Sequence, residues 1–261
     1  MIADDRGFLG GPTLGTIRPD GRSQFVHWFR RSAPYINAHR GRTFVISFGG
    51  EAVQSPEFPD LVHDLALLHS LGVRLVLVVG TRPQVEERLT RRGIALRYHA
   101  GLRITGGDAL DCVKEAAGVV RGEVEARLSM GVANSPMAGF RLRVASGNFV
   151  TARPLGVRDG VDYLHTGEVR RFDRVGVEQR LDDGCIVLIV PLGYSPTGDV
   201  FNLSGEDVAL SAARSLKADK LVYLTESALP LDAGGRTLRE ISVPRLEERI
   251  RRGEVRDRLL E

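Results

Sequence analysis

Four glycine-containing loops carry the residues that could do chemistry in this 261-residue sequence. They are Phe48-Gly49-Gly50-Glu51, Gly80-Thr81-Arg82-Pro83, the stretch from Gly101 to Gly107 with Arg103 inside it, and the stretch from Gly193 to Asp207, which includes Asn202, Ser204 and Glu206. Glycine lets a backbone approach a ligand closely, and arginine can hold a carboxylate or phosphate through two parallel hydrogen bonds. Together these residue types are compatible with an anion-binding crevice.

Each loop also has a purely structural explanation. A glycine pair after a strand often only forms a turn, so Gly49 and Gly50 fit either role. Arg82 suits a surface ion pair as well as a carboxylate ligand, and for Arg103 a structural ion pair is the commoner explanation. Ser204 and Asp207 match a capping box, which would start a helix without any ligand, although the same helix N-terminus could face an anion.

The elements that would position these loops follow from the hydrophobic pattern. Strands are predicted over 43–47, 73–80, 185–191 and 220–225, and helices over 59–71, 83–93, 108–130, 173–184, 205–218 and 245–261. Continuous apolar strands joined by helices indicate a parallel sheet that is covered on both faces. The polar block between them predicts a hairpin turning near 146–148 and a further strand pair over 162–171.

We therefore expect an α/β fold, with three αβα layers, a mainly parallel central sheet and an inserted β-hairpin lid. In such a sheet a ligand crevice lies beyond the carboxyl ends of the strands, and the four loops fall at that edge. Residues 1–22 lack periodicity and predict a disordered tail, so that one domain would cover 23–261.

An aromatic amphipathic helix is predicted before the first strand, over 24–38. Its aromatic residues are Phe25, Trp28, Phe29 and Tyr35. Pro34 would end or kink this helix, because proline lacks the N–H of a helical hydrogen bond. The apolar face would pack either on its own domain or on another subunit.

Composition excludes several classes of function. Thirty-six basic and 33 acidic residues give a net charge of +3, too small and too scattered to argue for nucleic acid. No apolar run is long enough to cross a membrane and the N-terminus lacks a basic signal region, so we expect a cytoplasmic protein. Cys112 and Cys185 predict reduced core thiols, without a disulfide framework or a metal site.

Lysine is rare, which bears on phosphate chemistry. The lysines are Lys114, Lys217 and Lys220, and all other basic residues of the 36 are arginine. A kinase that needs a lysine on the transferred phosphate therefore has few candidates.

Several motifs together carry a resemblance that no single loop carries. They are FVHWFRRSAPYINAHRGRTFVISFGGEAV, LLHSLGVRLVLVVGTRPQV, GLRITGGDAL, EARLSM, SGNFVTARPLGVRDGVDYLHTGEVRR, and FNLSGEDVAL with LKADKLVYLTE. In order and spacing they resemble the amino-acid kinase fold, specifically the N-terminal domain of the bacterial N-acetylglutamate synthases, over residues 24–226. Those enzymes make N-acetyl-L-glutamate from acetyl-CoA and L-glutamate, the first step of arginine biosynthesis.

The resemblance implies that the crevice is a degenerate form of a kinase site. N-acetylglutamate kinases carry a lysine two residues before the first glycine pair, where this sequence has Ser47. Their Asn-x-Asn-x-Asp run is matched by Asn202, Ser204 and Glu206. Their His-Gly-Gly-Gly-type loop is matched by Gly80-Thr81-Arg82-Pro83, in which proline has no N–H to donate. With three parts altered, we expect no kinase activity.

The resemblance also implies a regulatory role rather than catalysis. In the synthases a separate C-terminal domain binds acetyl-CoA and transfers the acetyl group, and we expect that the residues given after Thr225 are too few to form it. We therefore expect this segment alone to be inactive, with no cofactor, and to stop before the last elements of the kinase-like domain, which complete the arginine pocket.

The expected effector is L-arginine, acting as an allosteric feedback inhibitor, with Tyr35 on its side of the pocket. Phe25, Trp28 and Phe29 would lie on the helix that interlaces with a neighbour to build a ring, expected to be a hexamer.

Two other interpretations stay open at this point. A divergent N-acetylglutamate kinase, in which Arg82 or Lys217 supplies the missing charge, is the enzymatic alternative. A scaffold with an empty crevice is the structural alternative.

Overall fold

The computed structural model describes residues 21–130, 142–225 and 240–252. The chain divides into two units, residues 1–40 and 41–261. The first contains helix α1 (Gly21–His39), so residues 21 and 22, which we expected in the tail, are helical, while residues 1–20 lie outside the described part. Pro34 is inside α1 and does not end it. None of the described helices is long and apolar enough to cross a membrane.

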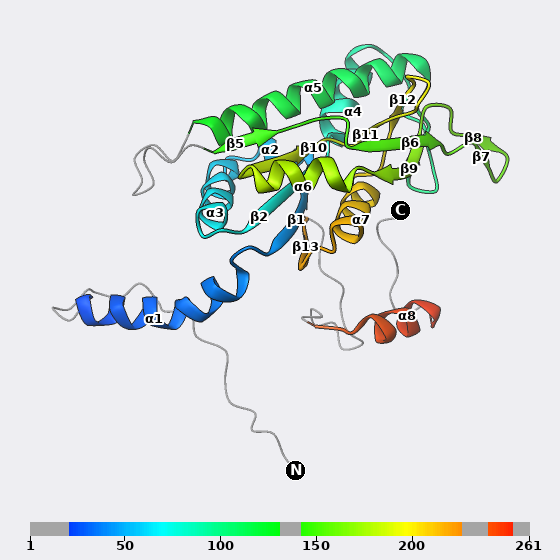
Figure 1. The fold of residues 1–261 in the computed structure, drawn as a ribbon. Coiled ribbons are helices and arrows are strands. Elements are labelled where there is room, and N and C mark those ends of the chain that lie inside the picture. Colours follow the sequence, from blue (N-terminus) through cyan, green and yellow to red (C-terminus); the bar gives the residue numbers. More distant parts are fainter. Residues whose placement is uncertain (1–20, 131–141, 226–239, 253–261) are drawn as a thin grey trace. The chain divides into compact units, whose positions relative to one another are not determined.

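Five strands form the central sheet of the second unit, in the order β13-β1-β2-β10-β5 (Figure 1). They are β1 (Thr43–Phe48), β2 (Arg74–Val79), β5 (Arg143–Ala145), β10 (Cys185–Ile189) and β13 (Lys220–Leu224). All four neighbouring pairs are parallel. Every residue of β1 is buried, as expected for a strand covered on both faces.

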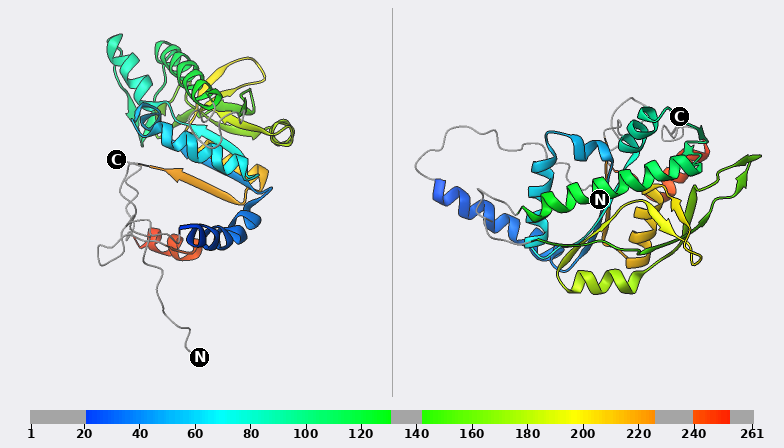
Figure 2. Two further views of the ribbon diagram at one scale, coloured as in Figure 1. Left: turned by 90° about the vertical axis from the view of Figure 1, so that its left-hand side faces the viewer. Right: turned by 90° about the horizontal axis from the view of Figure 1, so that it is seen from above.

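Helices cover both faces of this sheet and give the three predicted layers (Figures 1 and 2). The helices of the second unit are α2 (Gly50–Gln54), α3 (Phe58–Ser70), α4 (Arg82–Arg91), α5 (Gly107–Ser129), α6 (Arg174–Asp182), α7 (Gly205–Leu216) and α8 (Val243–Arg251). Alternate residues of β1 point to opposite faces. Phe44, Ile46 and Phe48 pack with residues of α3 and α5, whereas Val45 packs with residues of α6 and α7. The α/β fold class is thereby confirmed.

Local signals account for several helix ends. Ser204 is the N-cap of α7, and its Oγ accepts a hydrogen bond of 3.1 Å from the backbone N–H of Asp207, as the capping box predicted. The Asp173 side chain caps α6 in the same way through Gly176. Gly93 follows α4 with a φ of 66°, a left-handed conformation that glycine adopts without strain.

The inserted region contributes strands to a second sheet, whose strand order is β12-β11-β6-β9. Its strands are β6 (Val150–Pro154), β9 (Gly167–Phe172), β11 (Leu192–Tyr194) and β12 (Val200–Asn202), and two short hairpins pair β3 (Tyr98–His99) with β4 (Leu102–Arg103) and β7 (Val157–Arg158) with β8 (Val161–Asp162). The β7–β8 hairpin projects from this sheet (Figure 1). The inserted region is therefore a packed sheet with one projecting hairpin.

The predicted hairpin near 146–148 is wrong. Strand β5 pairs with β10 in the central sheet, whereas β6 pairs with β9 and β11 in the second sheet. The reason is burial: Leu142 and Val144 pack into one core cluster, while Val150 and Ala152 pack into the other. The two segments belong to different sheets and do not pair with each other.

A buried polar network attaches the second sheet to the loop before α5. Thr166 Oγ1 donates to the backbone carbonyl of Arg103 and lies 2.9 Å from Thr105 Oγ1. The backbone N–H of Thr105 donates to Thr166 Oγ1 at 3.2 Å, and Asn202 Nδ2 donates to Thr105 Oγ1 at 3.1 Å. Thr105 and Thr166 are both buried. The network therefore joins three segments that are distant in sequence.

We expect Thr166→Val to lower the free energy of unfolding by about 1–3 kcal/mol, because a change of similar shape leaves buried polar groups without partners. Urea denaturation measures this. The matched control is Thr151→Val in the same sheet: Thr151 is half-buried and has no hydrogen bond to its hydroxyl among the described residues, so a change within about 0.5 kcal/mol is expected. Equal losses in both variants would contradict a stabilising role for the network.

Candidate functional site

The glycine loops that follow β1 and β2 meet at the carboxyl edge of the central sheet. Because β1 and β2 are parallel, Gly49-Gly50 and Gly80 follow them at the same edge. The backbone N–H of Gly80 donates to the carbonyl of Phe48 at 2.8 Å. A Cβ added at Gly80 would lie 3.3 Å from the Cα of Gly49, a close approach that favours glycine. The sequence placed these loops together correctly.

Gln84, which the sequence reasoning missed, packs against the first loop. Its Nε2 donates to the backbone carbonyl of Gly50 at 2.8 Å, and a Cβ added at Gly50 would lie 2.1 Å from its Oε1. Gln84 is buried, and its Oε1 has no hydrogen-bond partner among the described residues. The space around Gly50 is therefore filled by a side chain of the same chain.

A cluster of two arginines, one glutamate and one tyrosine lies beside these loops. Glu86 Oε1 is 3.0 Å from Arg82 Nε, 3.2 Å from Arg103 Nη2 and 2.5 Å from the hydroxyl of Tyr98. The guanidinium carbons of Arg82 and Arg103 lie 5.0 and 4.8 Å from the centre of the Tyr98 ring. One carboxylate therefore compensates two cations, and the cluster keeps a positive charge.

The electrostatics of the cluster leave a hydrogen-bond donor available. Burial raises the pKa of Glu86, but hydrogen bonds from Tyr98 and Arg82 and the charges of both arginines outweigh it, so the pKa lies below its ordinary value. Burial, followed by the bond to Glu86, raises the pKa of Tyr98, which stays protonated. Arg103 is 7% exposed, and its Nη1 has no partner among the described residues. Such a group can donate to a carboxylate.

The N-terminus of α7 is already occupied by its own side chains. Ser204 accepts from Asp207 and donates to Glu206 Oε2 at 2.9 Å, and Tyr223 donates to the backbone carbonyl of Glu206 at 3.2 Å. Burial, then the charges of Glu206 and Glu168, raises the pKa of Asp207. The carboxyl groups of Glu206 and Asp207 in the first turn supply the negative charge that a helix N-terminus attracts. Their presence disfavours a bound phosphate at this end of the helix.

The remaining crevice residues differ in how far they are engaged. Asn202 uses its Nδ2 on Thr105. Ser47 is buried on β1, as the cross-strand neighbour of Tyr223 and Val78. Thr81 is the N-cap residue of α4, and no hydrogen bond from its side chain caps that helix. The structure thus brings the predicted loops together but ties most of their side chains to one another.

No lysine lies at the carboxyl edge. Lys217 is the C-cap of α7 and Lys220 begins β13, which places both at the amino ends of the parallel strands. Lys220 Nζ lies 5.5 Å from the centre of the Phe44 ring. Lys114 pairs with Asp111 on α5 at 2.7 Å. All three lysines of the sequence are thus accounted for elsewhere.

The expected effector and oligomer residues belong to the first unit. Trp28, Phe29 and Tyr35 are 61, 53 and 64% exposed on α1. The side chain of Phe25 lies outside the described part. All crevice residues belong to the second unit, so Tyr35 is described separately from them.

One missed site residue, Glu86, had a readable signal in the sequence. Arg82 and Glu86 are four residues apart on α4, the spacing at which helix side chains pair. Nothing in the sequence connected Tyr98 or Gln84 to the crevice. Cys112 is buried and Cys185 half-buried, both as free thiols, and the described residues contain no cluster of three or more metal-ligating side chains.

Comparisons with known proteins agree with this geometry. The model of the amino acid kinase family matches residues 42–256. The amino-acid acetyltransferase of Pseudomonas putida is 57% identical over 228 residues, covering 87% of this chain and 53% of the relative. That of Azotobacter vinelandii is 58% identical over 217 residues, covering 83% and 50%. The chain thus spans about half the length of the curated relatives it matches.

Solved structures of an N-acetylglutamate synthase show the same fold. N-acetylglutamate synthase from Neisseria gonorrhoeae, complexed with coenzyme A and L-arginine, superposes with a TM-score of 0.79 at 37% identity, covering 86% of this chain and 53% of that one. The same enzyme with coenzyme A and N-acetyl-glutamate gives 0.76 at 36% identity, covering 86% and 51%. The chain belongs to the amino acid kinase family and is related to the amino-acid acetyltransferases.

Proposed function

We propose that this chain is the regulatory, oligomer-forming kinase-like domain of an N-acetylglutamate synthase and that it transfers no phosphate. Its relatives carry the name amino-acid acetyltransferase, and the gonococcal synthase was solved with L-arginine. The proposal places this chain in arginine biosynthesis, in the cytoplasm, with acetyl transfer carried out by a part of the protein outside this segment.

The absence of lysine from the carboxyl edge is the observation that carries the proposal. Phosphoryl transfer depends on positive charge held against the transferred group, and one such arginine contributes about 10³–10⁵ in rate. Here Lys217 and Lys220 lie at the opposite edge, and Ser47 contributes no charge. Glu206 and Asp207 add negative charge at the helix end that would otherwise attract phosphate.

The divergent-kinase alternative has little support from this geometry. Lys217 lies at the wrong edge of the sheet, and Arg82 shares Glu86 with Arg103.

A scaffold with an empty crevice is less favoured than a residual carboxylate site. The specific observation is Arg103, which is buried with one guanidinium nitrogen unpartnered among the described residues. Leaving such a donor buried costs stability unless a ligand or water satisfies it.

The aromatic face of α1 supports the regulatory and oligomeric parts of the proposal. Trp28, Phe29 and Tyr35 expose large apolar surfaces on one helix. A guanidinium ligand such as L-arginine packs favourably on an aromatic face, which suits Tyr35. A neighbouring subunit would cover Trp28 and Phe29 in a ring, proposed to be a hexamer.

We expect no ADP release from the chain with ATP, Mg²⁺ and N-acetylglutamate, and none from Ser47→Lys. One restored cation does not replace the missing donors, and the carboxyl groups of Glu206 and Asp207 remain. A coupled assay measures ADP. Turnover in the unaltered chain that is abolished by Arg82→Gln would establish the kinase alternative instead.

We expect N-acetylglutamate to bind weakly to the crevice and Arg103→Gln to reduce its affinity about tenfold or more, since a charge-assisted hydrogen bond to the carboxylate is lost. Calorimetry with N-acetylglutamate, L-arginine and ATP measures this. Arg92→Gln serves as the control, because Arg92 pairs with Glu115 on the surface at 2.7 Å and should not affect binding. No heat from any of the three ligands would favour the scaffold.

We expect the double variant Trp28→Ser, Phe29→Ser to have a lower mass by light scattering, with a nearly unchanged circular dichroism spectrum, because the apolar contact between subunits is removed. The control changes Val157 and Val175 to serine, which are 66 and 62% exposed in the second unit. An unchanged mass in the α1 variant would argue against assembly through this helix.

A further inference from the structure

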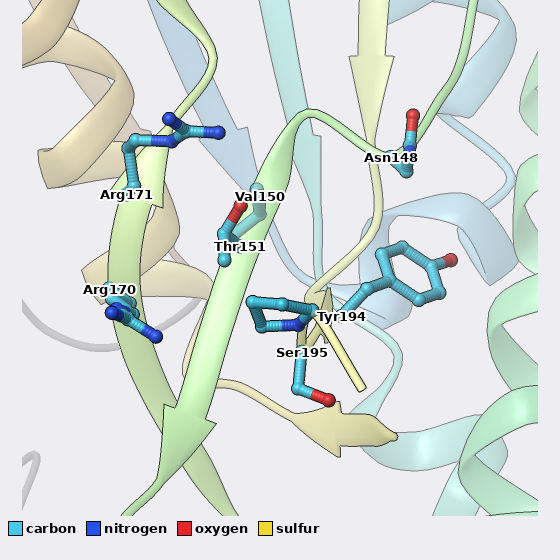
Figure 3. A pocket seen from close by; sticks show the side chains of 8 residues that line it. Asn148, Val150, Thr151, Arg170, Arg171, Tyr194 and Ser195 are labelled. Atoms are coloured by element: carbon cyan, nitrogen blue, oxygen red, sulfur yellow. The ribbon is translucent and has the colours of Figure 1, made fainter. Parts of the chain in front are cut away.

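A cavity of about 460 Å³ lies on the outer face of the second sheet and shares no residue with the crevice. Eight residues line it, the polar or charged Asn148, Thr151, Arg170, Arg171, Tyr194 and Ser195 together with Val150 and Pro196 (Figure 3). Its volume falls in the range of small-molecule sites, about 300–1,000 Å³. The proposed function leaves this cavity without a role.

Strand register places three of its side chains in one row. Tyr194 on β11 is opposite Thr151 on β6, and Thr151 is opposite Arg171 on β9. Directly opposed residues project to the same face of a sheet. The next residues along the two strands, Ala152 and Phe172, are buried in the core on the other face. The row therefore faces outward, with a rigid apolar core behind it.

A β-bulge brings a second arginine to the same cavity. Thr151 pairs with Arg171, but the next residue, Ala152, pairs with Val169, so Arg170 is the extra residue on β9. In a regular strand consecutive side chains point to opposite faces, and a bulge changes that direction. Figure 3 shows both arginines extending from β9 on the side of Thr151.

The two arginines carry uncompensated positive charge. Neither Arg170 nor Arg171 makes an ion pair or a hydrogen bond with another described side chain. Glu168, on the same strand, is held by Arg153 and Arg158 at 2.6 and 2.7 Å. Asp199, four residues after the cavity residue Ser195, accepts hydrogen bonds from Ser195 and Thr197 at 3.0 and 2.7 Å and makes no ion pair with either cavity arginine.

We propose that this cavity binds a small organic phosphate that carries a planar ring. A single arginine fork satisfies a carboxylate, whereas two forks with the Thr151 hydroxyl suit a dianionic phosphate with more acceptor oxygens. The Tyr194 ring, 37% exposed at the other end of the row, offers a face on which a planar group packs. The inference goes beyond the proposed function and does not depend on it.

The test is calorimetry on the full chain with AMP as the probe and with adenosine, inorganic phosphate and benzoate for comparison. We expect saturable AMP binding, with adenosine and benzoate about tenfold weaker or more, because each lacks the phosphate. Arg171→Gln should weaken AMP about tenfold or more through loss of a charged fork. Tyr194→Leu should weaken AMP but not inorganic phosphate, since only the ring loses its contact.

The control is Arg153→Gln, on the same face of the sheet but engaged with Glu168, which should leave AMP binding unchanged. Thermal melting checks that each variant is folded. The proposal is overturned if AMP does not bind, if benzoate binds as tightly as AMP, or if Arg171→Gln binds AMP normally. It is equally overturned if Arg82→Gln, in the crevice, abolishes AMP binding while Arg171→Gln does not.

Discussion

Burial of strand β1 on both faces is the constraint on which the rest of the structure depends. Its six residues are all buried, so helices must cover both sides, and a helix between successive strands makes those strands parallel. Parallel strands end at the same edge. The glycine loops, the arginine cluster and the N-terminus of α7 therefore meet there because of the way the core is packed.

The chemistry at that edge is decided by charge balance within the chain. Two arginines share the carboxylate of Glu86, and the first turn of α7 carries carboxyl groups of its own. A nucleotide phosphate would have to compete with these internal anions without a lysine to help it. A single carboxylate ligand needs much less positive charge than a nucleotide phosphate. The buried Nη1 of Arg103 offers one hydrogen-bond donor for it. The same fold is thus compatible with a site that binds a carboxylate and, as we propose, transfers no phosphate.

The outer face of the second sheet shows the opposite balance. Its acids are engaged by other side chains, and two neighbouring arginines remain without carboxylate partners among the described residues. A regular strand would turn Arg170 towards the face where Ala152 and Phe172 are buried, at a large cost in desolvation. The bulge avoids that cost and concentrates charge at the cavity.

The sequence by itself determined the parallel sheet, most helices, the capped start of α7 and the meeting of the glycine loops. Each rests on local signals: continuous apolar strands, helical periodicity, and Ser204 with Asp207. It failed at 146–148, because only the tertiary structure shows that β5 and β6 belong to different sheets. Tertiary packing alone brought Tyr98 to Glu86 and Gln84 to Gly50, and turned Arg170 to the same face of the sheet as Arg171. Contacts between distant segments, and the register that a bulge shifts, depend on packing that no local pattern specifies.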